Sequence, residues 1–85
     1  MNKQQQKESA QRMLEVIFDR LGGDEYGAKA AHKVAALMAV NVATVKRWRN
    51  GDIDITGSRQ VMIKMFYCLP KAELRKQADE ALKNV

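Results

Sequence analysis

If residues 42–50 form a helix, five side chains on its outer face could contact the edges of nucleobases: Val42, Ala43, Lys46, Arg47 and Asn50. Arg and Lys hydrogen-bond guanine, Asn hydrogen-bonds adenine, and small apolar side chains contact the methyl group of thymine. The apolar Val45 and Trp48 fall on the opposite side of such a helix and suit a core. The spacing therefore predicts a helix with one face for packing and one for base contact.

The excess positive charge of the chain is concentrated around the same segment. Residues 31–51 contain Lys33, Lys46, Arg47 and Arg49 and no acidic residue, so they carry +4 of the chain's formal net charge of +5. Residues 1–30 are neutral overall, and residues 52–85 carry the remaining +1. A local, acid-free basic surface suits the neutralisation of phosphates. The alternative interpretation is an ordinary solvated helix surface.

The length and the cysteine count limit what the chain can be. With 85 residues it forms one domain, near the lower end of what buries a self-sufficient core. A single Cys permits no internal disulfide, and a lone thiol fits a reducing compartment, so we expect a cytoplasmic, nucleoid-associated protein. The sequence has no apolar run long enough to span a membrane and no secretory signal at its polar N-terminus, so we expect no membrane partner.

Residues for catalysis or metal binding are lacking. The chain has one His, one Cys and no glycine-rich phosphate loop. These residues make neither a nucleophilic site nor a four-ligand metal site. We therefore expect no enzyme activity, no metal and no cofactor.

The elements that must position these residues are predicted to be helices. One Pro, few Gly and abundant Ala, Lys, Met, Leu and Gln favour a compact all-α domain of four to five helices. We expect a flexible N-terminus at 1–7, a main domain at 8–69 and a C-terminal helix within 70–85. The expected helices cover about 8–21, 28–38, 42–49, 58–68 and 70–83, with a loop at 24–29.

Apolar residues at helical spacing predict the core. In the first helix they are Met13, Leu14, Ile17, Phe18 and Leu21; in the second, Val34, Leu37 and Met38; and in the fourth, Val61, Met62, Met65, Phe66 and Leu69. Trp48 and Cys68 are expected in the core as well. Gly22 and Gly23 should end the first helix, and Asn50-Gly51 the third, because Gly accepts the left-handed conformation. Pro70 should occupy the first position of the last helix.

The segment around the basic helix resembles a known motif. Ala31 and Ala35 are small enough for two helices to cross closely, Ala39-Val40-Asn41 has the length of a tight turn, and Asn41 is placed as an N-cap. Together with the run 43–51 (ATVKRWRNG), these residues resemble the helix-turn-helix of the lambda-repressor-like family, which includes phage repressors, Cro proteins and many antitoxins. The resemblance covers roughly residues 10–70.

The resemblance implies a role for each matching position. Val42, Ala43, Lys46 and Arg47 would contact bases, with Asn41 and Asn50 at the helix ends near bases or phosphates. His32 matches a position where the family contacts phosphate, and we expect Lys33, Thr44, Arg49 and Arg59 to contact phosphates as well. Two positions depart from the family. Ala39 replaces its usual turn Gly, which requires a positive φ or an altered turn, and Ala31 replaces its usual Gln.

These features predict a sequence-specific regulator that binds double-stranded DNA. By the resemblance it would be a phage-type or Cro-like repressor, bound as a homodimer to a palindromic operator with helix 42–50 in the major groove. The last helix presents Leu74, Ala78 and Leu82 as an apolar seam, which serves either dimerisation or packing on the domain. Two alternatives stay open: an antitoxin-type regulator that also binds a protein partner, and a protein-binding antirepressor module that does not bind DNA.

Overall fold

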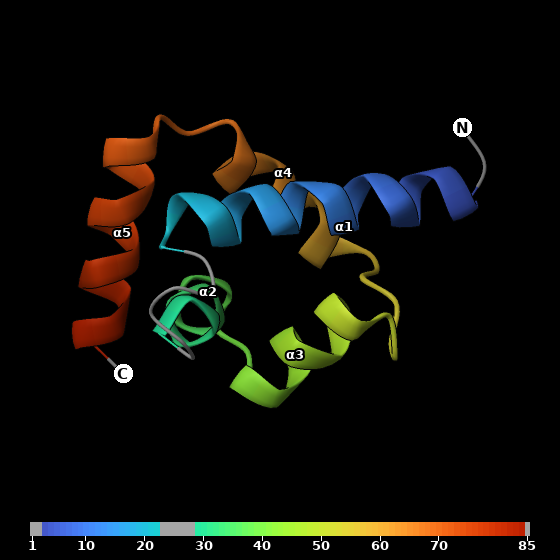
Figure 1. Ribbon diagram of the computed structural model, residues 1–85, viewed down its shortest axis with the longest axis horizontal. Coiled ribbons are helices and arrows are strands. Elements are labelled where there is room, and N and C mark those ends of the chain that lie inside the picture. Colours follow the sequence, from blue (N-terminus) through green and yellow to red (C-terminus); the bar gives the residue numbers. More distant parts are fainter. Residues whose placement is uncertain (1–2, 23–28, 85) are drawn as a thin grey trace.

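The part of the chain that the structure describes folds into five α-helices with no strand (Figure 1). The computed structural model describes residues 3–22 and 29–84, including side chains from Ser9 onward in the first range. The helices are α1 (Lys3–Arg20), α2 (Lys29–Met38), α3 (Val42–Asn50), α4 (Ser58–Tyr67) and α5 (Lys71–Lys83). The all-α prediction is confirmed. None of these helices is long and apolar enough to cross a membrane.

The helix boundaries differ from the expected ones mainly at the N-terminal ends. The first helix begins at Lys3 rather than near Glu8, since the Gln and Lys residues there are good helix formers. Pro70 does not occupy the first helical position; it precedes α5 with an extended ψ of 148°. The loop expected at 24–29 lies outside the described residues, apart from Lys29, which begins α2.

One apolar core joins all five helices. In Figure 1, α1 runs through the middle of the molecule; it packs chiefly on α4, while α2 packs on α5 and α3. The buried residues of α1–α3 and of the turn after α1 are Ala10, Leu14, Ile17, Phe18, Leu21, Ala30, Ala31, Val34, Ala35, Met38, Val45 and Trp48. The predicted core faces of α1 and α2 are therefore confirmed, with Met13 and Leu37 only partly buried at the edge.

The predicted core face of α4 was only partly right. Three of its residues are partly buried against the core: Met62, Phe66 and Leu69. The other two are exposed, and the most buried residue of this helix was not predicted. Ile63 is its fully buried residue, whereas Val61 and Met65 are 59% and 62% exposed. Cys68, also expected in the core, is exposed. The cause is that α4 carries apolar residues all around its axis, so spacing alone does not identify the side that meets α1.

The last helix packs on the domain. Leu74 and Ala78 are completely buried, and α5 lies against α2. Their assignment to a dimer contact is therefore wrong, because both side chains are buried in the core of the same chain. Leu82, one turn further on, remains 39% exposed.

Candidate nucleic-acid interface

A tight turn of Ala39, Val40 and Asn41 joins α2 to α3. Ala39 has a φ of 54°, the single positive φ at a non-glycine residue in the described part of the chain. Its N–H donates to Ala36 O at 3.3 Å, and the Val40 N–H donates to Ala35 O at 3.0 Å. This pair of bonds is the Schellman arrangement that usually has Gly at the left-handed position. The sequence left two possibilities open at Ala39, a positive φ or an altered turn, and the structure has the positive φ.

Arg59 fixes this turn from the side of α4. Its Nη1 donates a 2.8 Å hydrogen bond to the carbonyl oxygen of Met38, the last residue of α2. Carbonyls at a helix C-terminus have no N–H partner within the helix, so a guanidinium can donate the hydrogen bond that they lack. Arg59 was expected to contact phosphate, but in the structure its side chain holds the end of α2.

Both ends of α3 are capped by residues that the sequence singled out. The side chain of Asn41 accepts a hydrogen bond from the Ala43 N–H at 2.9 Å, which confirms the N-cap. At the other end Gly51 has a φ of 78°, and its N–H donates to Trp48 O at 3.2 Å. The Asp52 N–H donates to Arg47 O at 2.9 Å. With both ends fixed, nine residues form a helix of defined length and direction.

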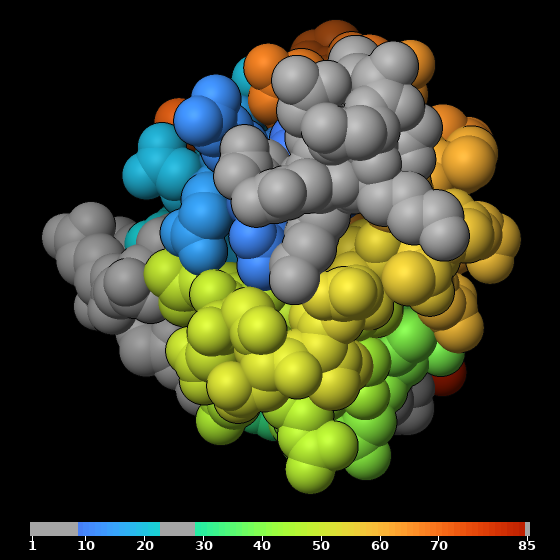
Figure 2. Space-filling model, turned by 90° about the vertical axis from the view of Figure 1, so that its right-hand side faces the viewer, coloured from blue at the N-terminus to red at the C-terminus, as the bar shows by residue number. Residues whose placement is uncertain are grey.

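The outer face of α3 is exposed and basic. Val45 is fully buried and Trp48 is 3% exposed, so these two residues fix the inner side of the helix and confirm Trp48 as a core residue. The side chains on the opposite side are exposed: Ala43, Lys46, Arg47 and Asn50. Neither Lys46 nor Arg47 forms an ion pair within the part of the chain that the structure describes. Figure 2 shows α3 and the loop after it, in yellow-green and yellow, side by side on one face of the molecule.

Two other expected phosphate contacts have partners within the protein. Arg49 Nε lies 2.9 Å from Glu15 Oε1, and its guanidinium carbon lies 4.4 Å from the centroid of the Phe18 ring, so Arg49 joins α3 to α1. Lys33 Nζ lies 3.2 Å from Asp79 Oδ1 and joins α2 to α5. Glu15 and Asp79 are both far in the sequence from the residues that they pair with. The spacing of charges along α2 and α3 therefore did not predict these contacts.

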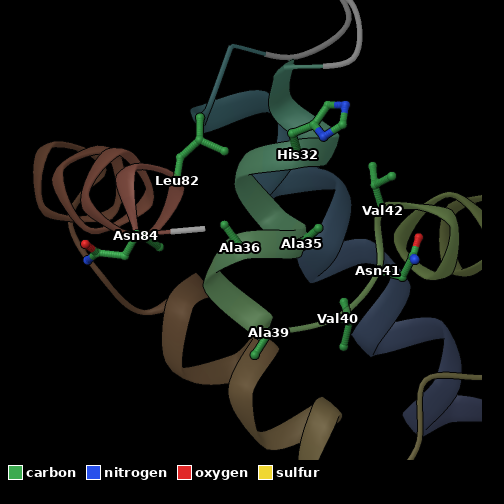
Figure 3. Close-up of a pocket in the computed structure, with 10 residues that line it drawn as sticks. His32, Ala35, Ala36, Ala39, Val40, Asn41, Val42, Leu82 and Asn84 are labelled. Atoms are coloured by element: carbon green, nitrogen blue, oxygen red, sulfur yellow. The ribbon is translucent and has the colours of Figure 1, made fainter.

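A groove brings the start of α2 close to the start of α3. Figure 3 shows His32 of α2 and Val42 of α3 on one side of it and Leu82 of α5 on the other. Ala35 and Ala36 lie between them, and Asn41 borders the groove at the turn. His32 is exposed, while Val42 and Thr44 are half-buried. His32 and the N-terminal end of α3 therefore border the same groove. The contribution of α5 to this groove was not predicted from the sequence.

No protein-family model, curated protein or solved structure matches the chain. Among the described residues, no group of three or more His, Cys, Asp or Glu side chains is placed to hold a metal ion. The features of the described residues that point to a function are therefore the exposed face of α3 and the turn that orients it.

Proposed function

We propose that the chain is a sequence-specific DNA-binding protein in which α2, the turn and α3 act as a helix-turn-helix. One observation carries the proposal: the exposed face of α3 is basic and free of acids, and its Lys46 and Arg47 form no ion pair with the described residues. This face lies opposite the side that Val45 and Trp48 anchor in the core. A short helix anchored along one side can enter the major groove with its other side.

The exposed side chains of α3 supply the chemistry for base contact. At about 100° per residue, Ala43, Lys46, Arg47 and Asn50 fall within about a third of the helix circumference. In this proposal Arg47 and Lys46 donate to guanine, Asn50 hydrogen-bonds adenine, and Ala43 contacts a thymine methyl group. Val42 is half-buried and reaches a base with only part of its surface.

Phosphate contacts follow from the ends of α2 and α3. Neither helix has an acidic residue in its first turn, so the partial positive charge of each N-terminus is not neutralised there. His32, Asn41 and Thr44 lie near these ends and can hydrogen-bond phosphate oxygens. Lys33 and Arg49 reach a phosphate only by leaving or sharing their acidic partners, Asp79 and Glu15. Their contribution to affinity is therefore smaller than that of Lys46 and Arg47.

We further propose that two copies bind a palindromic site and repress transcription by occluding a promoter, as the resemblance to phage repressors implies. Because Leu74 and Ala78 are buried, Leu82 is the residue of the original seam that is still exposed for pairing. In this proposal the protein acts by binding and catalyses no reaction.

The salt dependence of binding tests this function. The affinity for a fluorescent duplex pool of random sequence is measured by anisotropy at several salt concentrations. Each neutralised phosphate contributes about −0.9 to the slope of log K against log [salt], so two to four contacts give a slope between about −2 and −4. The double variant Lys46→Ala, Arg47→Ala should reduce that slope by about 2. A flat salt dependence, or a slope unchanged in the variant, would contradict DNA binding through α3.

A further inference from the structure

Helix α4 is apolar on two opposite sides. Its inner side is centred on Ile63, which is fully buried. On the other side lie Val61, 59% exposed, and Met65, 62% exposed, followed by the exposed Cys68 just past the helix end. At about 100° per residue these three residues fall within about 60° of one another, opposite Ile63. We call Val61, Met65 and Cys68 the α4 stripe.

Such a stripe is unusual for a helix on the surface of a small domain. Surface helices generally have one apolar side, turned to the core, and a polar side turned to water. Single exposed apolar residues need no explanation, but three in succession along one line are the pattern by which amphipathic helices pack side by side. The core that the described residues form does not include the stripe, so its apolar surface is available to another molecule.

The charged residues around the stripe indicate the charge of the molecule that would bind it. Residues 55–72 contain Arg59, Lys64 and Lys71 and no acidic residue. Arg59 is engaged with the end of α2, whereas Lys64 and Lys71 are exposed. Lys64 belongs to the helix turn between Val61 and Met65, directly beside the stripe. The stripe is thus apolar, with the positive charge of Lys64 beside it.

This charge distribution disfavours a second copy of the chain as the occupant. Two copies that packed antiparallel through their stripes would bring their Lys64 ammonium groups close together near the symmetry axis. Like charges placed opposite each other across an interface oppose association. A nucleic acid is also a poor match, since phosphates gain nothing from contact with Val61 and Met65.

We propose that the α4 stripe is a docking site for an acidic amphipathic helix of another protein. Such a helix would place apolar side chains at i, i+4 and i+7 on Val61, Met65 and Cys68, and a Glu or Asp side chain beside Lys64. The proposal does not depend on DNA binding by α3, because it uses none of the side chains assigned to bases or phosphates.

Two synthetic peptides test it. Each is about 18 residues long so that it is helical in isolation, and both have Leu at i, i+4 and i+7. One has Glu at the flanking positions and the other Lys. Binding of each labelled peptide to the whole 85-residue chain is followed by anisotropy, and alkylation of the Cys68 thiol is followed by mass spectrometry. We expect the Glu peptide to bind at least about tenfold more tightly than the Lys peptide and to slow alkylation of Cys68.

Variants at exposed positions locate the site without loss of the fold. The double variant Val61→Ser, Met65→Ser should lose at least about tenfold in affinity for the Glu peptide. The variant Leu82→Ser, which removes an exposed apolar side chain elsewhere, should leave that affinity unchanged. Lys64→Glu should lower the affinity for the Glu peptide and raise the affinity for the Lys peptide.

Three results would overturn the proposal. The first is that neither peptide binds the chain. The second is equal affinity for both peptides, which would mean that the charges beside the stripe select nothing. The third is a concentration-dependent dimer, seen by sedimentation, that Val61→Ser, Met65→Ser abolishes; this would assign the stripe to a second copy of the chain.

Discussion

Arg47 and Arg49 lie two positions apart on α3, and the structure gives them different surroundings, which makes them a matched pair for mutation. Arg47 is exposed and forms no ion pair with the described residues, so its side chain contributes little to the fold. Arg47→Ala should therefore change the free energy of unfolding by no more than about 0.5 kcal/mol. If Arg47 contacts guanine, the same change should cost about 1–3 kcal/mol of specific binding. That loss corresponds to an increase of about 5- to 150-fold in Kd.

Arg49→Ala removes the same charge from the same helix and is the control. It breaks the ion pair with Glu15, which is partly exposed and worth about 0.2–1 kcal/mol. It also removes the contact with the Phe18 ring, worth about 0.5–1 kcal/mol. Arg49→Ala should therefore lower the free energy of unfolding by about 0.7–2 kcal/mol in total. Its effect on DNA affinity should be similar for all sequences.

Two measurements separate the variants: urea denaturation for stability, and anisotropy titration with a duplex selected from a random library and with single-base variants of it. We expect Arg47→Ala to relax the preference at one base position while its stability is unchanged. The assignment of Arg47 to a base would be refuted if both variants lost equal affinity with unchanged base preference. It would also be refuted if Arg47→Ala bound as tightly as the original chain.

Three further changes test how α3 is held in place. Ala39→Gly should raise the free energy of unfolding by about 0.5–1 kcal/mol, because Gly adopts the φ of 54° without steric cost; an unchanged thermal midpoint would mean that Ala39 is not strained. Trp48→Ala should lower stability by about 3–5 kcal/mol in urea denaturation, since the side chain is 3% exposed; a variant of undiminished stability would place Trp48 at the surface. Leu74→Ala should cost about 2–5 kcal/mol, whereas Leu82→Ala should cost less than about 1 kcal/mol, and equal costs would contradict the packing of α5 on α2.

The local features of α2 and α3 were predictable because short-range rules determine them. Asn41 caps α3 through a bond to a residue two positions away, and Gly51 ends it with a left-handed conformation. The positive φ at Ala39 was one of the two possibilities that its place in the turn allowed. The inward position of Trp48 followed from helical spacing within a few residues. Each of these predictions needed only neighbouring residues.

The features that the sequence did not predict depend on contacts between distant segments. Arg49 pairs with Glu15, 34 residues away in the sequence. Arg59 donates a hydrogen bond to the carbonyl oxygen of Met38, 21 residues away. Long flexible side chains satisfy whichever partner the fold brings near, and the charge pattern of one helix does not reveal that partner. The prediction that Val61 and Met65 of α4 are buried was wrong for a related reason. Its apolar residues surround the axis, and packing on α1, through Ile63, selects the buried side.

Selection from a random duplex library at about 0.15 M salt tests most directly whether the exposed face of α3 reads bases. The chain is mixed with the library, the retained duplexes are sequenced, and the same selection is made with Lys46→Ala, Arg47→Ala. We predict enrichment of a palindrome with half-sites about one helical turn (about 34 Å) apart, and loss of this enrichment in the variant. Enrichment of a single unrepeated site would support base recognition by the chain but refute binding as a dimer. No enrichment by the original chain would contradict the proposed function.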